Sequence, residues 1–230
     1  MAQAPRPAEV FPSLTSFSPE DVPHLPSDEP VWAVLDPDHP HALRTQLIAV
    51  IEAQSGLVSG HEGRAYSVDE SAGRVAVHKT ATIEPGVHLV GPCLIGPHVT
   101  VRHAAYVRPW TWACEGSVIG HATEVKHSIL LPGAKAPHFN YVGDSILGHG
   151  VNLGAGVKLS NLRHDGGEVH LSLDGDRVGT GLRKFGAVLG DGVQVGCNAV
   201  TNPGCVLAPG STVDPNVTVG GVHRTAVRHR

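Results

Sequence analysis

The sequence predicts an all-β chain built on a parallel β-helix, in which each turn of the backbone stacks on the turn before it. Two observations support this fold class. An aliphatic side chain recurs at nearly every sixth residue, and a small or β-branched side chain often lies two residues before the next such position. A period of six fits neither an α-helix nor an alternating antiparallel strand, but it is the period of hexapeptide-repeat solenoids.

The aliphatic positions fall into three runs, and Thr201 is their only polar member. Three six-residue steps complete one triangular coil, so residues eighteen apart are expected to stack on one another. Glycine often follows the aliphatic residue, where it permits the backbone angles of a sharp corner. The positions are Val77, Ile83, Leu89, Ile95, Val101, Val107, Ala113, Ile119, Val125 and Leu131, then Leu147, Leu153 and Leu159, then Leu189, Val195, Thr201, Leu207, Val213 and Val219.

Residues 1–72 are expected to form a proline-rich lead-in and a capping helix. Seven prolines precede residue 31, which predicts an extended segment that lies on a surface or stays mobile. A short strand is expected at VWAVLD, residues 31–36. After it, Asp38 can cap a helix whose apolar stripe contains Leu43, Leu47, Val50 and Ile51 and which ends before Gly56. This stripe is expected to cover the open end of the β-helix, with docking of another protein as the alternative.

The β-helix itself is expected over residues 73–222, with the period interrupted at 132–142 and at 162–186. The second interruption alternates polar and apolar residues around Asp174-Gly175-Asp176, which predicts a β-hairpin. An insertion that leaves a rigid scaffold can carry binding residues, or it can be a tolerated surface loop. The basic tail, residues 223–230, is expected to fray.

Composition and charge exclude several classes of partner. The net charge of −4 gives no electrostatic basis for binding nucleic acid. The sequence contains no apolar run long enough to span a membrane, and its first twenty residues lack an apolar signal region. A soluble, cytoplasmic chain without a nucleic-acid or membrane partner is therefore expected.

A set of polar motifs from about Tyr106 to Val219 resembles a known family. The motifs are Arg108-Pro109, Glu124-Val125-Lys126, Lys135-Ala136 followed by His138, Tyr141 and Gly143-Asp144, then Gly148, Val151-Asn152, Gly154-Ala155-Gly156, Asn161 and Lys184. They resemble the acetyltransferase domain of the bifunctional enzyme that makes UDP-N-acetylglucosamine. The resemblance implies a left-handed β-helix and a homotrimer with sites between subunits. It also implies acetyl transfer from acetyl-CoA to an amino-sugar phosphate such as glucosamine 1-phosphate, or to a nucleotide-linked amino sugar, with no metal required.

The resemblance also implies roles for individual residues. His138 falls on the general base, a task that suits an imidazole near neutral pH. Arg108 and Lys126 match phosphate-binding positions, and their separation of eighteen residues predicts a stacked cationic pair. Sugar-contacting positions are matched by Tyr141, Asn152 and Asn161, and cofactor-side positions by Ala155, Lys184 and Cys197. Taken singly, most of these residues could equally be solvated charges or turn residues.

The sequence departs from the family pattern at the walls of this site. Trp110 stands where the family has glycine, Leu162 where it has tyrosine, and Cys197 where it has serine. No glycine-rich nucleotide loop of the nucleotidyltransferase domain occurs in the sequence. The base and phosphate positions are therefore intact, whereas the identity of the acceptor is open.

Two other function classes remain as alternatives. One is a trimer that binds a sugar phosphate or nucleotide sugar without catalysis. The other is a zinc enzyme similar to the γ-type carbonic anhydrases, since His103 and His121 are eighteen residues apart, with His98 and His127 near in sequence. Stacked histidines can also simply hydrogen-bond along a ladder.

Overall fold

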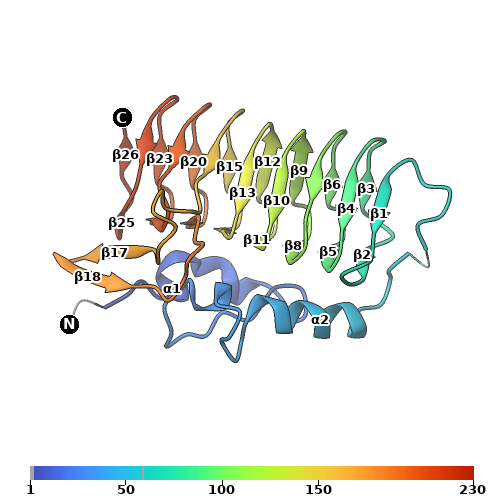
Figure 1. The fold of residues 1–230 in the computed structure, drawn as a ribbon, viewed down its shortest axis with the longest axis horizontal. Coiled ribbons are helices and arrows are strands. Elements are labelled where there is room, and N and C mark those ends of the chain that lie inside the picture. Colours follow the sequence, from blue (N-terminus) through green and yellow to red (C-terminus); the bar gives the residue numbers. More distant parts are fainter. Residues whose placement is uncertain (1–2, 59) are drawn as a thin grey trace.

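The computed structural model describes residues 3–58 and 60–230, so residues 1, 2 and 59 of the predicted lead-in lie outside the described residues. It shows a left-handed parallel β-helix with the N-terminal segment lying along one side (Figure 1). The fold class predicted from the six-residue period is confirmed. A two-stranded antiparallel hairpin projects beside the later coils.

Three parallel sheets of eight strands form the three sides of the β-helix. Sheet 1 contains β1 (Ser67–Asp69), β4 (His88–Val90), β7 (Tyr106–Val107), β10 (Glu124–Lys126), β13 (Tyr141–Gly143), β16 (Lys158–Leu159), β21 (Val200–Thr201) and β24 (Thr218–Val219). Sheet 2 contains β2 (Val75–Val77), β5 (Cys93–Ile95), β8 (Thr111–Ala113), β11 (Ser128–Leu130), β14 (Ile146–Leu147), β19 (Ala187–Leu189), β22 (Cys205–Leu207) and β25 (Val222–His223). Sheet 3 contains β3 (Thr82–Ile83), β6 (Thr100–Val101), β9 (Val118–His121), β12 (Lys135–His138), β15 (Asn152–Leu153), β20 (Gln194–Val195), β23 (Thr212–Val213) and β26 (Arg228–His229).

The interior of the β-helix is a column of aliphatic side chains, most of them on the predicted six-residue positions. The prediction for Leu131 is wrong, because Leu130 takes the inward place and pairs with Ala113, seventeen residues away. The step from Val125 to Leu130 is one residue short, and the step from Val142 to Leu147 is short in the same way. Leu131 instead packs into the cluster that lies outside sheet 2.

The strands extend beyond the predicted limits of residues 73 and 222. The first strand, β1, already begins at Ser67 and pairs with β4. At the other end, the prediction of a frayed tail is wrong, because β26 pairs with β23 with Thr212 opposite Arg228. Arg228 also contacts Asp214 through an ion pair of 2.9 Å. The tail therefore completes the last coil of sheet 3.

The N-terminal segment contains four short helical elements: α1 (Pro7–Val10), the 3₁₀ helices η1 (Pro12–Ser16) and η2 (Ala33–Leu35), and α2 (Leu43–Ala53). The strand predicted at residues 31–36 is wrong. Val31 to Leu35 are buried in succession, so the run packs on all sides instead of alternating, and its centre is η2. None of the helices in the described ranges is both long and apolar enough to cross a membrane.

The amphipathic helix predicted after Asp38 is confirmed as α2, although it begins only at Leu43. Its buried side chains Leu43, Leu47 and Ile51 pack with outward-facing residues of sheet 2, such as Leu94 and Trp112. The helix thus lies along the face of sheet 2, and the prediction that it caps the open end is wrong (Figure 1). The outer face of sheet 2 is apolar along several coils, so it covers more of the apolar stripe of α2 than the single coil at the end of the β-helix could.

The insertion at residues 162–186 contains the predicted hairpin, β17 (His170–Leu173) and β18 (Asp176–Gly179). Asp174 and Gly175 form its turn, both with positive φ, as a two-residue hairpin loop requires. Leu171, Leu173 and Phe185 are buried in the same cluster as the N-terminal segment. The insertion is therefore a packed part of the fold that borders the corner between sheets 1 and 2.

Candidate functional site

Arg108 and Lys126 lie one above the other at the corner where the chain passes from sheet 1 to sheet 2. The register of β7 and β10 places Val107 beside Val125, which confirms the predicted separation of one coil. Each cation has an acidic partner, however, and the two do not form an unpaired cationic stack. Arg108 Nη1 lies 2.7 Å from Glu124 Oε1, and Lys126 Nζ lies 2.8 Å from Asp144 Oδ2.

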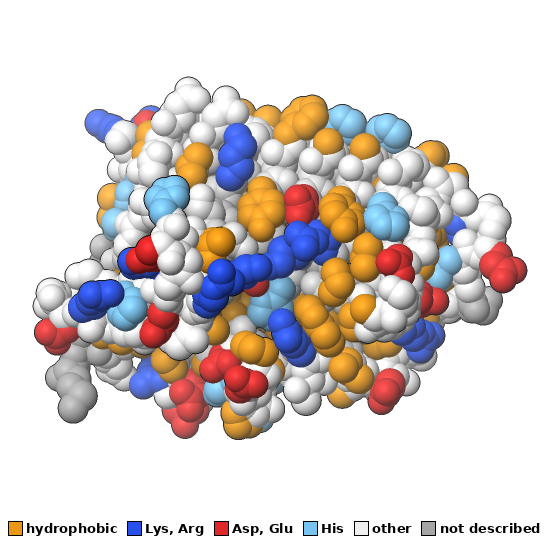
Figure 2. All heavy atoms as spheres, in the orientation of Figure 1, with side chains coloured by type: hydrophobic (Ala, Val, Ile, Leu, Met, Phe, Trp, Pro, Cys, Tyr) orange, Lys and Arg blue, Asp and Glu red, His pale blue; other side chains and the backbone are white. Residues whose placement is uncertain are grey.

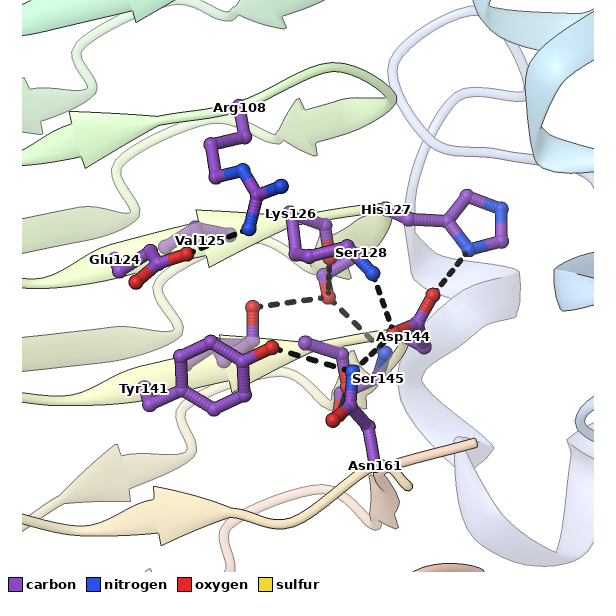
Figure 3. Close-up of polar contacts among 12 residues, drawn as sticks. Arg108, Glu124, Val125, Lys126, His127, Ser128, Tyr141, Asp144, Ser145 and Asn161 are labelled. Atoms are coloured by element: carbon purple, nitrogen blue, oxygen red, sulfur yellow. Dashed lines mark hydrogen bonds and ion pairs between the residues drawn. The ribbon is translucent and has the colours of Figure 1, made fainter. Parts of the chain in front are cut away.

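Asp144 is the centre of a buried polar cluster at this corner (Figure 3). Its carboxylate accepts hydrogen bonds from Lys126 Nζ at 2.8 Å and from His127 Nδ1 at 2.9 Å, and a third from the Asn161 amide. The side chain of Asp144 is only 5% exposed and that of His127 only 8%. Burial by itself would raise the pKa of Asp144, but the hydrogen bonds and charges of His127 and Lys126 outweigh it and hold the pKa below its ordinary value.

The two short steps of the β-helix bring this cluster together. His127 lies two residues after the inward Val125, and Asp144 lies two residues after the inward Val142. Both are corner residues with positive φ, 42° for His127 and 50° for Asp144. A five-residue step makes a tighter corner, so each side chain turns toward the other across neighbouring coils. The ring nitrogen Nε2 of His127 is buried and has no hydrogen-bond partner among the described residues.

Tyr141 and Asn161 extend the cluster across the outer face of sheet 1. The Asn161 amide nitrogen donates to Tyr141 Oη at 3.2 Å, and burial raises the pKa of Tyr141. Gly143 lies between them, and a Cβ at this position would come within 2.7 Å of Tyr141 Oη and 2.8 Å of Asn161 Nδ2. A side chain at position 143 would therefore keep Tyr141 and Asn161 from meeting.

His138 lies at the opposite edge of sheet 1, at the corner that follows sheet 3. It ends β12, where it pairs with His121, and its side chain is exposed. Asn140, a residue that sequence reasoning did not assign, fixes the backbone here. Its Oδ1 accepts from His138 N at 3.0 Å, while its amide donates to Gly154 O at 2.8 Å.

Ala155 and Cys197 occupy the same corner as His138 on the following coils, since Gly156 N donates to His138 O and Asn198 N donates to Ala155 O. Cys197 is exposed, unlike the other three cysteines. Asn152 lies on β15 of sheet 3, beside Lys135. The structure thus separates the predicted residues, with the cations at one edge of sheet 1 and His138, Ala155 and Cys197 at the other. Tyr141 and Asn161 lie between these edges, and Asn152 lies apart on sheet 3.

A cavity of about 510 Å³ opens at the corner that carries Arg108 and Lys126. Its other walls come from the N-terminal segment, including Arg44 of α2, and from the return of the insertion, where Arg183 and Lys184 lie. Lys and Arg side chains form a row across the middle of this face of the molecule (Figure 2). Lys184 was predicted from the resemblance, whereas Arg44 and Arg183 carry no motif that would have identified them.

The histidines proposed as zinc ligands do not converge within one protomer. His103 and His121 stack as predicted, with ring centroids 5.6 Å apart, but His121 Nδ1 is bonded to His103 O at 2.9 Å. His127 lies at another corner, bonded to Asp144. In the part of the chain that the structure describes, no group of three His, Cys, Asp or Glu side chains is placed to hold a metal ion.

The chain matches the family model described as the GMPPB C-terminal domain over residues 89–222, more than half of its length. The chain belongs to this family. The matched region contains every residue that the motifs predicted for the site, from Arg108 to Cys197. The N-terminal segment, with Arg44, lies outside the region shared with the family.

Several curated proteins are similar to this family member. The bifunctional sugar-1-phosphate nucleotidylyltransferase/acetyltransferase of Sulfurisphaera tokodaii is 38% identical over 154 residues, which cover 64% of this chain and 38% of the relative. The bifunctional protein GlmU of Methanococcus vannielii is 40% identical over 115 residues, which cover 50% of this chain and 28% of the relative. The chain therefore spans well under half the length of these two proteins. The uncharacterized acetyltransferase YaiX of Escherichia coli is 27% identical, with 90% of this chain and 87% of that protein covered.

Solved structures with a partial likeness include the acetyltransferase domain of PglB from Neisseria gonorrhoeae, at 11% identity and a TM-score of 0.22 over 65% of this chain and 51% of that chain. AntD, an N-acyltransferase from Bacillus cereus, gives 13% identity and a TM-score of 0.28 over 74% of this chain and 83% of that chain. At these scores neither structure bears on the arrangement of the site, which rests on the contacts above.

Proposed function

We propose that the protein transfers an acetyl group from acetyl-CoA to the amine of an amino-sugar phosphate or of a nucleotide-linked amino sugar. The observation that carries this proposal is the outer face of sheet 1. Arg108 and Lys126 lie at one edge of it, the exposed imidazole of His138 lies at the other, and Tyr141 and Asn161 lie between them. Similarity to curated proteins that are named for acetyltransferase activity supports the same conclusion.

In this proposal Arg108 and Lys126 bind the phosphate of the acceptor, and Tyr141 and Asn161 orient its sugar. Asn152 lies on sheet 3, so it would contact the sugar only from a neighbouring subunit. The proposed base, His138, takes a proton from the attacking amine, so that the nitrogen–carbon bond forms as the carbon–sulfur bond of the thioester breaks. The proton then returns from the imidazole to the departing thiolate. Asn140 serves as a positioning residue, because it fixes the backbone on which His138 is carried.

The corner beside His138 fits a thioester that must approach the backbone closely. Acetyl-CoA would supply an activated carbonyl there. Ala155 is flanked by two glycines, and a Cβ at Gly154 would lie 2.5 Å from Cys197 N. Ala155 and Cys197 would therefore line the cofactor side of the site, with backbone amides available to a developing oxyanion. Lys184, which the resemblance assigns to the cofactor side, lines the cavity with Arg108 and Lys126 instead, so its ammonium would serve the phosphate end.

We also infer a homotrimer with sites between subunits. The outer face of sheet 2 is already covered by the N-terminal segment, whereas exposed apolar side chains remain on and beside sheet 1, among them Tyr106 at 41% and Phe139 at 55% exposure. A Phe139→Asp variant is expected to weaken the assembly, because it places a charge in this contact. Light scattering should give three times the 24.0 kDa chain mass for the wild type and a smaller value for the variant. A wild-type monomer that turns over substrate would contradict this inference.

The test of the function is release of CoA from acetyl-CoA with glucosamine 1-phosphate and with a panel of nucleotide-linked amino sugars. Turnover is expected in the wild type, and His138→Ala should lower kcat by about a hundredfold or more, the usual cost of losing a general base. His164→Ala is the matched control, since this exposed histidine lies in the insertion.

Equal rates for the two variants would contradict the role of His138. Binding of the acceptors without any turnover would instead indicate the non-catalytic alternative. Zinc bound in stoichiometric amount by protein without a histidine tag, together with CO₂ hydration, would indicate the carbonic-anhydrase alternative.

A further inference from the structure

We propose that the cavity at the corner of sheets 1 and 2 binds the nucleoside diphosphate of a nucleotide-linked acceptor, with Arg44, Trp110 and Arg183 as its specific walls. This inference rests on the proposed function and selects between its two acceptor classes. Arg108 and Lys126 are already phosphate binders in that proposal. The additional walls come from the N-terminal segment, from the family-variant position after Pro109, and from the insertion.

The charges around the cavity favour an anionic ligand. Five Lys or Arg side chains line the cavity, against three Asp. Lys126 is offset by Asp144, and Arg108 by Glu124. Arg44 comes from α2, whereas Arg183 and Lys184 are adjacent residues in the return of the insertion. All three are exposed, and among the described residues only Asp36 and Asp38 oppose them in the wall, so a bound phosphate would relieve the repulsion among them.

A buried polar atom also lacks a partner in the cavity wall. His127 lines the cavity, and its side chain is only 8% exposed. Asp144 holds Nδ1 of this ring, while Nε2 is buried and has no hydrogen-bond partner in the described residues. An unpaired buried group costs stability. Because Nδ1 donates to Asp144, Nε2 accepts from a ligand hydroxyl when the ring is neutral, and it donates to a phosphate oxygen when the ring carries a proton on both nitrogens.

The opposite wall has the chemistry for a nucleoside. Asp36 and Asp38 belong to the N-terminal segment, and carboxylates at such a place can accept hydrogen bonds from ribose hydroxyls. Trp110 also lines the cavity and offers a flat ring, with the Arg44 guanidinium 5.2 Å from its centroid. The volume of about 510 Å³ is within the range of pockets that hold whole small molecules, and is far larger than one phosphate needs.

The position of the cavity assigns it to the acceptor and not to CoA. Ala155 and Cys197, the residues proposed for the cofactor side, lie at the other edge of sheet 1 beside His138. A diphosphate among Arg108 and Lys184 would direct the attached sugar over Tyr141 toward that edge. The amine would then reach His138 from the side opposite the nucleoside.

The experiment is calorimetric titration of the wild type with UDP, dTDP, GDP and CDP, with the matching monophosphates and with inorganic phosphate. No acetyl-CoA is added, so the result does not depend on turnover. At least one diphosphate is expected to bind about tenfold or more tightly than its monophosphate, because a second charged phosphate gains its own contacts. Arg44→Ala and Arg183→Ala should each raise the dissociation constant of that diphosphate by about tenfold. Arg177→Ala, on the exposed strand β18 outside the cavity, is the matched control and should bind as the wild type does.

The inference is overturned if no diphosphate binds better than phosphate, or if Arg44→Ala and Arg183→Ala bind like the control. His138-dependent acetylation of glucosamine 1-phosphate without diphosphate binding would reject this inference and leave the proposed function standing. Diphosphate binding that depends on Arg44, with no acetyl transfer to any acceptor, would support this inference and reject the proposed function. Because all three arginines are exposed, melting temperatures close to that of the wild type will show that a loss of binding is not a loss of folding.

Discussion

Replacing Asp144 with alanine is expected to lower the free energy of unfolding by about 3–5 kcal/mol, since it leaves three cationic or polar partners without their acceptor. The carboxylate accepts from Lys126, His127 and Asn161, and the side chains of Asp144 and His127 are almost fully buried. Activity should fall as well, because Lys126 and Asn161 lose the group that holds them toward the acceptor. Urea unfolding of the wild type and the variant measures the first effect, and CoA release measures the second.

The pH dependence of stability provides a second measurement on the same residue. The pKa of Asp144 is held below its ordinary value of 3.8 in the folded protein. Its contribution to stability is therefore present above pH 3.8 and is lost as the pH falls through the lowered pKa of the folded state. Asp144→Asn should remove this part of the acid sensitivity. Asp176→Ala, on the exposed strand β18, should keep it. If Asp144→Ala were as stable as Asp176→Ala, the hydrogen bonds of Asp144 would not contribute measurably to the stability of the fold.

The sequence predicted the β-helix because its core is local and periodic. Each inward side chain is six residues from the next, so the pattern can be counted without knowing the tertiary structure. The two shortened steps could not be located in this way. Leu130 and Leu131 are both apolar and both buried, and only the packing of Leu131 against the outer cluster decides which of them faces inward.

The candidate site was predictable only in part, for a similar reason. Arg108, Lys126, Tyr141 and Asn161 belong to motifs at fixed spacing, and the structure links them through Asp144 and Glu124. Asp144 was part of the same motif, but its partners depend on the five-residue corners. Arg44 could not be inferred, because α2 was expected at the end of the β-helix and not beside the cavity.

The place of α2 on sheet 2 leads to the other large prediction. Leu47→Ala is expected to lower the free energy of unfolding by about 2–5 kcal/mol, because it opens a cavity where the side chain is fully buried. Leu47 is 0% exposed and packs in the cluster that joins α2 to the outer face of sheet 2. Thermal or urea unfolding of the purified variant measures the change.

Ile48→Ala is the matched control for this variant, since it removes a side chain of the same size from the next position of the same helix. Ile48 is 44% exposed, so its loss should change the free energy of unfolding by well under 2 kcal/mol. If the two variants were equally stable, α2 would not be held on sheet 2 by its apolar stripe. Because α2 also carries Arg44, the affinity of each variant for the diphosphate can be measured as well. A helix loosened by Leu47→Ala should bind the diphosphate more weakly than Ile48→Ala does, whereas equal affinities would mean that Arg44 reaches the cavity without the support of this packing.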